Sequence, residues 1–399
     1  MPRALDRLRG GVRLGTDVAA AVGAVGLDAA RELRGAALPS TPEALVQPQL
    51  LGRLLGRSVR SAELPGVDFE SSNCRNFLVD VTYTDGEAVT MYAKLPARQF
   101  GPRVFANALG YWALECSFCR DVAEHVQVRI PRVHAVEQRG SRFVLLMEDI
   151  SALPGARTFV NRDTAAGTTE EQARRVLTAF AELHAPFHSW DAAARERVLP
   201  IALHPFVPPK RRPVTRSLNL AAVTQAHKKA PELVGDDVVR VYRRTLENWD
   251  LVVDYWYSGG LTLAHGDSHL ANCFEYDDAR GNRRVGFLDF QGVHWSPGIR
   301  DVVYFLVNSM DPALLAGLEK PLVEHYLAEL GARGVDLDLD RTWELYRSLV
   351  FQVLVVGVVA VGLGGFTESE ATVRTMLERQ LAGLERLGYA DLLEELIAR

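Results

Sequence analysis

The densest group of polar side chains in an apolar setting is the segment His265-Gly-Asp-Ser-His-Leu-Ala-Asn272, entered from Leu261-Thr-Leu-Ala264. A second acidic group follows in Val285-Gly-Phe-Leu-Asp-Phe-Gln291. Transfer of a phosphoryl group needs a carboxylate that orients the attacking hydroxyl, oxygen ligands for Mg²⁺ and a cation on the phosphates. Carboxylate and amide oxygens on loops suit a hard, partly hydrated Mg²⁺. The two segments therefore indicate phosphoryl-transfer chemistry.

The spacing of these residues follows a known kinase pattern. Protein kinases use a loop H-R-D-x-x-x-x-N and a later D-F-G. Asp267 and Asn272 keep the same five-residue offset, and Asp289-Phe290 stands where the second metal ligand is expected. The combination is specific, whereas the tripeptide His265-Gly-Asp267 alone would be a weak signal.

A cation for the phosphates is available upstream. Lys94, in Met91-Tyr-Ala-Lys94, falls on the third predicted strand, where a lysine that pairs with the α/β-phosphates is expected. Glu115 lies in the helix predicted next and is the best partner for this lysine, while Asp121 and Glu124 are rival acids nearer the helix end. Taken alone, Lys94 would be read as a surface lysine.

The elements that must position these residues fall into two parts. Alternating apolar residues and an Asp85-Gly86 turn predict a small, mostly antiparallel sheet with one helix. From Val59 on we expect three strands, one helix and two strands. The clearest of these segments are Phe77–Tyr83, Ala88–Leu95, a helix over Pro102–Glu124, Arg132–Glu137 and Phe143–Met147.

Beyond Ile150 helical patterns dominate. The expected segments are helices over Glu170–His188, Asp236–Tyr257 and most of Ile299–Arg399, with one hairpin, Cys273–Tyr276 and Val285–Asp289. We therefore predict an α+β fold with a helical extension outside the main fold (1–50), a nucleotide-binding lobe (51–150), and a helical lobe with the catalytic loop and acceptor site (151–399).

Composition narrows the class of protein. A net charge of −5 gives no basic footprint for nucleic acid. The apolar stretch Leu349–Phe366 is long enough to cross a membrane, but its glycines and the polar Gln352 favour a buried helix, and we expect no stable membrane insertion. Cys116 and Cys119 form a CxxC without a second pair, so reduced thiols are expected rather than a zinc site. A reducing cytoplasm fits this cysteine usage.

The chain resembles the aminoglycoside phosphotransferase and choline kinase superfamily over roughly Val59 to Phe366. It looks closest to the ecdysteroid-kinase-like (CHK kinase-like) branch. Besides the two segments above, the resemblance lies in Leu145-Leu-Met-Glu-Asp-Ile150, Leu183-His-Ala185 and Pro297-Gly-Ile-Arg-Asp301. It implies that the protein has a two-lobed protein-kinase-like fold and uses ATP and Mg²⁺.

The resemblance also implies residue roles. Asp267 would be the catalytic base or orienting carboxylate, Asn272 and Asp289 would hold Mg²⁺, and Lys94 with Glu115 would clamp the phosphates. Main-chain groups around Met147, Glu148 and Asp149 would receive adenine. Asp301 would brace the catalytic loop rather than touch substrate.

The first hairpin departs from the protein-kinase pattern. Its turn, Glu70-Ser-Ser-Asn-Cys-Arg-Asn76, lacks the glycines of a phosphate loop. Backbone N–H groups near Ser71, Ser72 and Asn73 can still cover phosphates. This turn argues against a protein substrate, as does the absence of Ala-Pro-Glu after Asp289.

Two other functions stay open. His265 and His269 with Asp267 would also suit a metal-dependent phosphoesterase, and a catalytically silent nucleotide-binding protein could share the fold. Neither the hydroxyl-bearing acceptor, the choice between ATP and GTP, nor the oligomeric state can be read from the sequence.

Three further groups of residues bear on the site. Lys210-Arg-Arg212 with Arg216 could gather an anionic acceptor or be a solvated loop. His184 and His188 are expected to serve packing rather than metal binding. Four tryptophans of the helical part favour a less polar acceptor: Trp190, Trp249, Trp256 and Trp295.

Overall fold

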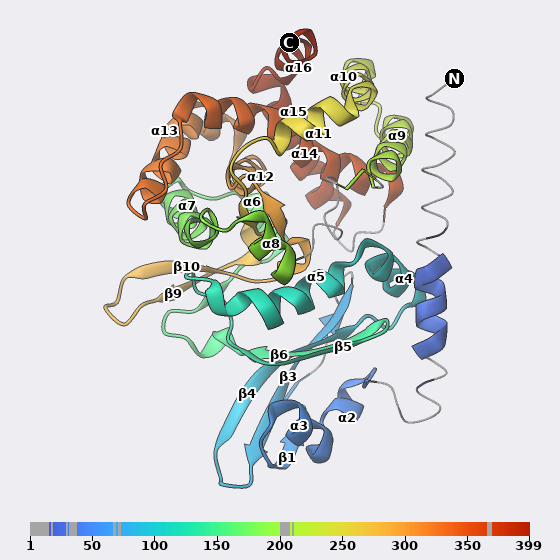
Figure 1. Ribbon diagram of the computed structural model, residues 1–399, viewed down its shortest axis with the longest axis vertical. Helices are drawn as coiled ribbons and strands as arrows, with labels where there is room; N and C mark the ends of the chain where they lie inside the picture. The colour runs from blue at the N-terminus through green and yellow to red at the C-terminus, as the bar shows by residue number, and fades with distance from the viewer. Residues whose placement is uncertain are drawn as a thin grey trace. The chain divides into compact units, whose positions relative to one another are not determined.

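The computed structural model describes residues 16, 19–28, 31, 38–66, 69–70, 73–199, 208–209, 211–364 and 369–399. The chain divides into two compact units, whose elements Figure 1 labels. The smaller unit comprises the described residues up to Glu124 together with Ile130–Leu153, and the larger one His125–Arg129 together with the described residues from Pro154 on. We describe each unit by itself.

The smaller unit is built on an antiparallel sheet. Its strands run in the order β1-β3-β4-β6-β5, and β2 pairs with β3. Their bounds are β1 (Val59–Glu63), β2 (Phe69–Glu70), β3 (Cys74–Tyr83), β4 (Ala88–Pro96), β5 (Val133–Arg139) and β6 (Arg142–Glu148). The predicted hairpin at Asp85-Gly86 is confirmed, because Gly86 adopts a φ of 95° between β3 and β4.

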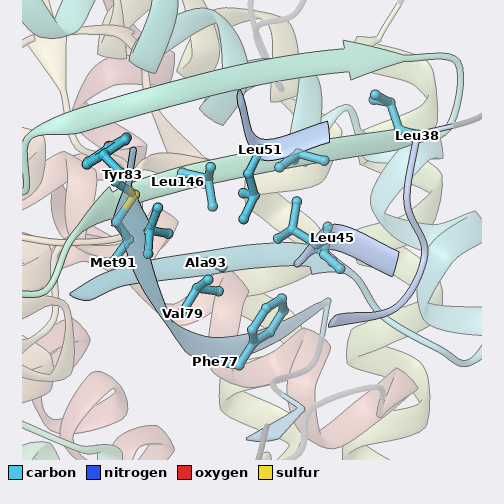
Figure 2. Packing of buried hydrophobic residues seen from close by; sticks show 12 residues of the cluster. Leu38, Leu45, Leu51, Phe77, Val79, Tyr83, Met91, Ala93 and Leu146 are labelled. Atoms are coloured by element: carbon cyan, nitrogen blue, oxygen red, sulfur yellow. The ribbon is translucent and has the colours of Figure 1, made fainter. Parts of the chain in front are cut away.

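Successive residues of a strand point to opposite faces, so this sheet has two different sides. One side packs its apolar residues against α2 (Pro42–Leu45) and α3 (Pro48–Leu55), and Figure 2 shows Leu45 and Leu51 lying over Phe77 and Ala93. The other side holds Cys74, Phe143 and Leu145 against Trp112 and Cys116 of the helix α5 (Tyr111–Ser117).

Residues 1–50 were expected outside the main fold, and the described part of them lies inside it. Leu38 and Leu45 are buried in the core of the sheet. Ala21 and Val25 of the helix Ala19–Asp28 pack with Val104. The reason for the difference is that the apolar side of the sheet needs a cover, which the chain supplies from its N-terminal part.

The helix expected over Pro102–Glu124 is broken. It forms α4 (Phe100–Leu109) and α5 (Tyr111–Ser117), followed by a π-helical turn, Phe118–Val122, and a 3₁₀ turn, Ala123–His125. Gly110 separates α4 from α5 with a φ of 77°, a conformation that glycine adopts without steric penalty.

Helices dominate the larger unit, as predicted. They are α6 (Asn161–Ala166), α7 (Glu170–His184), α8 (Ala192–Val198), α9 (Arg212–Lys229), α10 (Asp236–Glu247), α11 (Trp249–Trp256), α12 (Ile299–Ser309), α13 (Pro312–Gly331), α14 (Leu339–Leu363), α15 (Glu370–Arg386) and α16 (Tyr389–Ala398).

Two helices are shorter than expected. α7 ends at His184 rather than His188, because Pro186 cannot donate the next helical hydrogen bond and the chain continues as a 3₁₀ turn. The stretch 236–257 is interrupted at Asn248.

Short strands form the part of the larger unit that carries the polar segments. β7 (Arg157–Thr158), β9 (Cys273–Asp277) and β10 (Arg283–Phe287) make one small sheet, and β8 (Thr262–Ala264) pairs with β11 (His294–Ser296). The expected α+β fold class, a small antiparallel-sheet part and a larger, mainly helical part, is confirmed.

The apolar stretch from Leu349 lies in α14, as expected of a buried helix, while Phe366 lies outside the described residues. By length and composition α14 could cross a membrane, yet 72% of its most apolar window is buried inside the structure. Trp256 of α11 donates to the carbonyl of Ser348 at 3.1 Å, so the neighbouring helices hold this helix by polar contacts as well.

We expect Leu45→Ala to lower the free energy of unfolding by about 2–5 kcal/mol, because Leu45 is fully buried in the core of the sheet. Urea unfolding followed by circular dichroism measures the change. Leu27→Ala is the matched control, since Leu27 is 62% exposed on the neighbouring helix, and it should change stability by less than about 0.5 kcal/mol. Equal effects of the two substitutions would mean that the N-terminal segment does not belong to the core.

Candidate active site

The loop His265–Asn272 follows β8, and backbone contacts fix it against the segment that follows β10. His265 Nε2 lies 2.7 Å from the carbonyl oxygen of Leu288, and the Leu288 N–H donates to the carbonyl of Asn272 at 2.9 Å. Because Nε2 donates to a carbonyl, Nδ1 is left to accept from the N–H of Asp267, at 3.3 Å. Asp267, Asn272 and Asp289 thus belong to two loops that are bound to each other.

A buried carboxylate stabilises the conformation of the loop His265–Asn272. Asp301, in the first turn of α12, is fully buried. Its Oδ2 accepts from the backbone N–H of His265 at 2.5 Å, and its Oδ1 accepts from the N–H of Gly266 and the Ser268 hydroxyl, both at 3.1 Å. The brace implied for Asp301 is therefore present as direct hydrogen bonds to the loop.

Asp301 is itself held by charged and polar neighbours. His184 Nε2 lies 3.2 Å from Oδ2, and Arg300 donates to Oδ1 at 3.1 Å. The other nitrogen of His184 lies 2.8 Å from the Tyr326 hydroxyl. Burial acts to raise the pKa of Asp301, but the hydrogen bond from His184 and the charge of Arg300 outweigh it and hold this pKa well below its usual range.

Two glycines let the loops touch. Gly266 has a φ of 89°, and a Cβ atom on it would stand 1.8 Å from the carbonyl oxygen of Gly292. Only glycine meets both the left-handed conformation and this close approach. The glycine between His265 and Asp267 is therefore required by the packing of one backbone on another.

Asp267 is a partly buried carboxylate held at both oxygens. The Tyr304 hydroxyl donates to Oδ1 at 2.9 Å, and the Asn272 amide donates to Oδ2 at 3.2 Å and to the backbone carbonyl of Asp267 at 2.7 Å. His269 Nε2 lies 3.7 Å from Oδ2. Desolvation acts to raise the pKa of Asp267, but the neighbouring His269 and the hydrogen bond from Tyr304 keep it well below its usual range, so the group is ionised at neutral pH.

Asp289 has an unusual backbone. Its φ is 60°, and it is the one non-glycine residue with a positive φ among the residues that the structure describes. Such conformations cluster at functional sites. Asp289 follows Leu288, whose backbone is hydrogen-bonded to His265 and Asn272, so it lies beside the loop. Burial lowers the pKa of His265, while the charges of Asp301, Asp267 and Asp289 act to raise it.

These residues fit a magnesium ion. The Asn272 amide turns its nitrogen toward Asp267, which leaves its carbonyl oxygen for another partner. Mg²⁺ is commonly bound by one or two carboxylates, waters and substrate phosphates rather than by a protein cage. A carboxylate from Asp289 and an amide oxygen from Asn272 are such a donor set.

In the smaller unit the predicted pair of Lys94 and Glu115 is present. Lys94 Nζ lies 2.6 Å from Glu115 Oε1, and the two side chains are only 7% and 3% exposed. Lys94 stands on β4 opposite Asn76, on the α5 side of the sheet. The hydrogen bond fixes the ammonium group within an otherwise apolar layer that contains Trp112 and Phe143.

The segment proposed for adenine ends β6. Met147 pairs with Tyr92 of β4 and Val133 of β5, and the Glu148 N–H donates to the Arg132 carbonyl at 2.8 Å. Asp149 accepts from the Ser151 N–H at 3.0 Å and caps a 3₁₀ turn. None of these contacts tests adenine binding, so the role of Met147, Glu148 and Asp149 in it stays a prediction.

The phosphate-loop residues are placed only in part. Ser71 and Ser72 lie outside the described residues. Asn73 precedes β3, and its carbonyl accepts from the Ala97 N–H at 3.1 Å, which ties this turn to the end of β4.

Other sequence candidates have structural partners. His184 serves the Asp301 network, as expected, and burial lowers the pKa of His188 to about 4. Arg212 pairs with Asp254 at 2.6 Å and Asp250 at 3.3 Å, while Lys210 lies outside the described residues. Cys116 carries a thiol whose pKa is raised to about 12 by burial and the charge of Glu115.

Sequence reasoning did not single out Tyr304. It lies one turn after Asp301 on α12, and its ring sits under the guanidinium of Arg300, 4.6 Å from its centroid. The spacing Asp301–Tyr304 is the signal that could have found it, because residues three apart share one face of a helix.

Comparison with known protein families gives one match. A sequence model of the ecdysteroid kinase-like family matches residues 116–337, more than half of the chain. The sequence matches none of the curated proteins with which it was compared.

Several solved structures resemble this chain at low identity. The ethanolamine kinase of Plasmodium vivax has a TM-score of 0.48 and 12% identity, with 81% of each chain covered. The choline kinase of Cryptosporidium parvum gives 0.41 and 11%, covering 84% of this chain and 90% of that one. The GDP complex of aminoglycoside 2'-phosphotransferase-IIIa gives 0.44 and 15%, covering 88% and 99%. Likenesses of this size assign neither substrate nor residue roles to this chain.

We expect Asp301→Asn to make the free energy of unfolding less sensitive to acid. The folded-state pKa of Asp301 is depressed, so its contribution is complete above its unfolded pKa of about 3.9 and is lost as the pH falls below that value. Urea unfolding between pH 7 and pH 3 should show a smaller loss of stability in Asp301→Asn than in the wild type. At pH 7 the variant should be less stable by about 3–5 kcal/mol.

The exposed Asp236 supplies the control for this experiment. Asp236→Asn should follow the wild-type curve. An Asp301→Asn curve parallel to wild type from pH 5 to pH 3 would contradict the buried, ionised assignment.

Proposed function

We propose that this chain, which belongs to the ecdysteroid kinase-like family, is an ATP-dependent phosphotransferase that moves the γ-phosphoryl group to a hydroxyl of a small molecule. The observation that supports this best is the ionised Asp267, held between Tyr304 and Asn272 on a loop that Asp301 braces. A carboxylate fixed in this way meets the main requirement of phosphoryl transfer, which is positioning.

Asp267 would orient the acceptor. An ionised carboxylate accepts several hydrogen bonds, so it can receive one from the acceptor hydroxyl in addition to those from Tyr304 and Asn272. A carboxyl with a strongly lowered pKa is a weak base. In a loose transition state the hydroxyl proton leaves late, so alignment of the attacking oxygen is the larger contribution of Asp267.

Asn272 and Asp289 would hold the metal. When bound, Mg²⁺ neutralises charge that develops on the phosphate oxygens. The hydrogen bonds of the Asn272 amide hold one of these donors in place, and the left-handed backbone of Asp289 sets the direction in which its side chain leaves the chain. The protein's contribution here is a pair of oxygen donors.

Lys94 would bind the phosphates. Glu115 accepts a hydrogen bond from the Lys94 ammonium and removes much of its conformational freedom. A fixed cation stabilises negative charge on the phosphates without reorganising during the reaction. Backbone N–H groups near Ser72 and Asn73 would cover the same phosphates.

Two observations favour this function over the alternatives. Among the described residues no group of three or more His, Cys, Asp and Glu side chains could hold a metal ion, whereas two-metal phosphoesterases need such clusters. A catalytically silent protein would have no use for Asp267, Asn272, Asp289 and the buried Lys94 together.

The acceptor is proposed as a small molecule with a hydroxyl group, since the chain carries no basic footprint for nucleic acid. We also propose a cytoplasmic setting, because all four cysteines carry thiols rather than disulfides.

Asp267→Asn should keep Mg²⁺·ATP affinity within about threefold of wild type and slow transfer by about 10²–10⁴-fold, since only alignment of the hydroxyl is lost. A screen of ATP consumption over alcohols and antibiotics would first supply an acceptor, and coupled assays then compare wild type, Asp267→Asn and the surface control Asp236→Asn. Near-normal transfer by Asp267→Asn would show that the loop has been misassigned. Phosphate release from phosphoesters by wild-type protein without any nucleotide would favour the hydrolase.

Lys94→Met keeps the apolar stem of the side chain and removes its charge. We expect it to weaken binding of Mg²⁺ with a non-hydrolysable ATP analogue at least about tenfold, because charge stabilisation of the phosphates is lost. Nucleotide-induced shifts of the melting temperature measure this without an acceptor, each variant being compared with its own nucleotide-free sample. Glu115→Gln should show a smaller defect, and Lys320→Met, at an exposed lysine, none. Unchanged nucleotide shifts in Lys94→Met would remove Lys94 from the site.

A further inference from the structure

The half of the loop that ends at Asn272 has supports of its own. The Leu270 N–H donates to the Ser309 hydroxyl at 3.2 Å, and the Ala271 N–H donates to the Thr164 hydroxyl at 3.1 Å. Thr164 belongs to α6 and Ser309 ends α12, and both side chains are fully buried. Two hydroxyl groups therefore hold the two residues that directly precede Asn272.

These hydroxyl groups supply acceptors that the loop cannot supply itself. Residues 270–272 form a 3₁₀ turn, in which the Asn272 N–H donates to the His269 carbonyl at 3.0 Å. The first N–H groups of a helical turn have no acceptor inside that turn. Because a buried N–H without an acceptor is strongly disfavoured, the two hydroxyls stabilise the turn that presents the Asn272 side chain.

Arg379 of α15 fixes the two hydroxyl groups relative to each other. It is only 7% exposed. Its Nη1 donates to the carbonyls of Thr164 at 2.7 Å and Asn308 at 2.8 Å, and its Nη2 donates to that of Ala165 at 2.7 Å. These carbonyls lie in the last turns of α6 and α12, where a helix offers no donors of its own. The guanidinium group therefore joins the helix end that carries Thr164 to the one that carries Ser309.

Contacts of neighbouring residues strengthen this junction. Gln380 Nε2 donates to the side-chain oxygen of Asn308 at 2.8 Å, and the Asn308 amide donates to the Tyr304 carbonyl at 3.0 Å. The Thr168 N–H donates to the Ser309 carbonyl at 2.7 Å. The helix α15 thus binds the end of α12 with two successive side chains, and the segment after α6 binds the same end.

We propose that Thr164 and Ser309 are positioning residues for the metal ligand Asn272, and that Arg379 holds both in place. This inference rests on the proposed function, because it takes Asn272 as a ligand of the Mg²⁺ used in phosphoryl transfer. Mg²⁺ demands nearly ideal octahedral geometry, so a small displacement of one oxygen donor weakens its binding. The helix α15, far along the chain from the loop, thereby contributes to metal affinity.

Hydrogen exchange of the full chain without nucleotide tests whether the hydroxyls hold the turn. Thr164→Val keeps the shape of the side chain and removes the acceptor, so the amides of residues 270–272 should exchange at least about tenfold faster than in wild type. Rates are read relative to amides of α14 in the same sample, which removes a change in global stability. Thr245→Val, at a fully buried threonine of α10, is the matched control and should leave residues 270–272 unchanged.

Binding of Mn²⁺ together with a non-hydrolysable ATP analogue tests the effect on the metal. Free Mn²⁺ is measured by its electron paramagnetic resonance signal. Thr164→Val/Ser309→Ala should weaken Mn²⁺ binding about tenfold and leave binding of the analogue without metal within about twofold of wild type, because groups that orient a metal ligand are removed. The control Thr245→Val/Ser348→Ala removes two buried hydroxyl groups of α10 and α14 and should leave Mn²⁺ binding unchanged.

A third variant tests the arginine. Arg379→Lys keeps the charge but cannot reproduce the planar guanidinium group that reaches three carbonyls, so it should weaken Mn²⁺ binding at least about threefold. Arg386→Lys makes the same exchange at a partly buried arginine of the same helix and should leave Mn²⁺ binding unchanged.

Two results would overturn this inference alone. They are unaltered exchange at residues 270–272 in Thr164→Val, and Mn²⁺ binding by wild type that Thr164→Val/Ser309→Ala matches. Equal losses in the control variants would also overturn it, since they would reflect a general loss of stability. A wild-type protein that does not bind Mn²⁺ with the analogue would instead overturn the proposed function, and with it the metal role of these residues, whatever the exchange rates.

Discussion

The hydrogen bonds that converge on the buried carboxylate of Asp301 hold the catalytic part of this protein together. An isolated ionised carboxylate in a protein interior is strongly disfavoured, so Asp301 must collect donors. It takes them from the loop backbone at His265 and Gly266 and from His184. The need to satisfy one buried charge therefore fixes the shape of the loop that presents Asp267.

Much of the fold could be predicted from short-range sequence patterns. Strands β3 and β4 alternate apolar and polar residues around a glycine turn, and both signals lie within a few neighbouring residues. The contact between Asp267 and Asn272 could be predicted for the same reason, because it spans only five positions. The pairing of Lys94 with Glu115 was also predicted correctly, from a strand followed by a helix.

What the sequence did not reveal depends on distant contacts. Tyr304 reaches Asp267 because α12 packs against the loop, so its three-residue spacing from Asp301 indicates the shared helix face but not this contact. The burial of Leu38 and Leu45 depends on a sheet face that forms later in the chain. Breaks such as the one at Gly110 are equally difficult, since a glycine inside a helical pattern can be tolerated or can end the helix.

The contact between Gly266 and Gly292 restricts how the two loops can move relative to each other. A Cβ on Gly292 would stand 3.0 Å from the carbonyl carbon of Gly266, so the two backbones already touch and cannot slide past each other. The loop that carries Asp267 and the one that begins at Asp289 consequently behave as a single stiff body. In the proposed reaction the substrates would meet a preassembled pair of loops, and any adjustment during turnover would take place outside this pair.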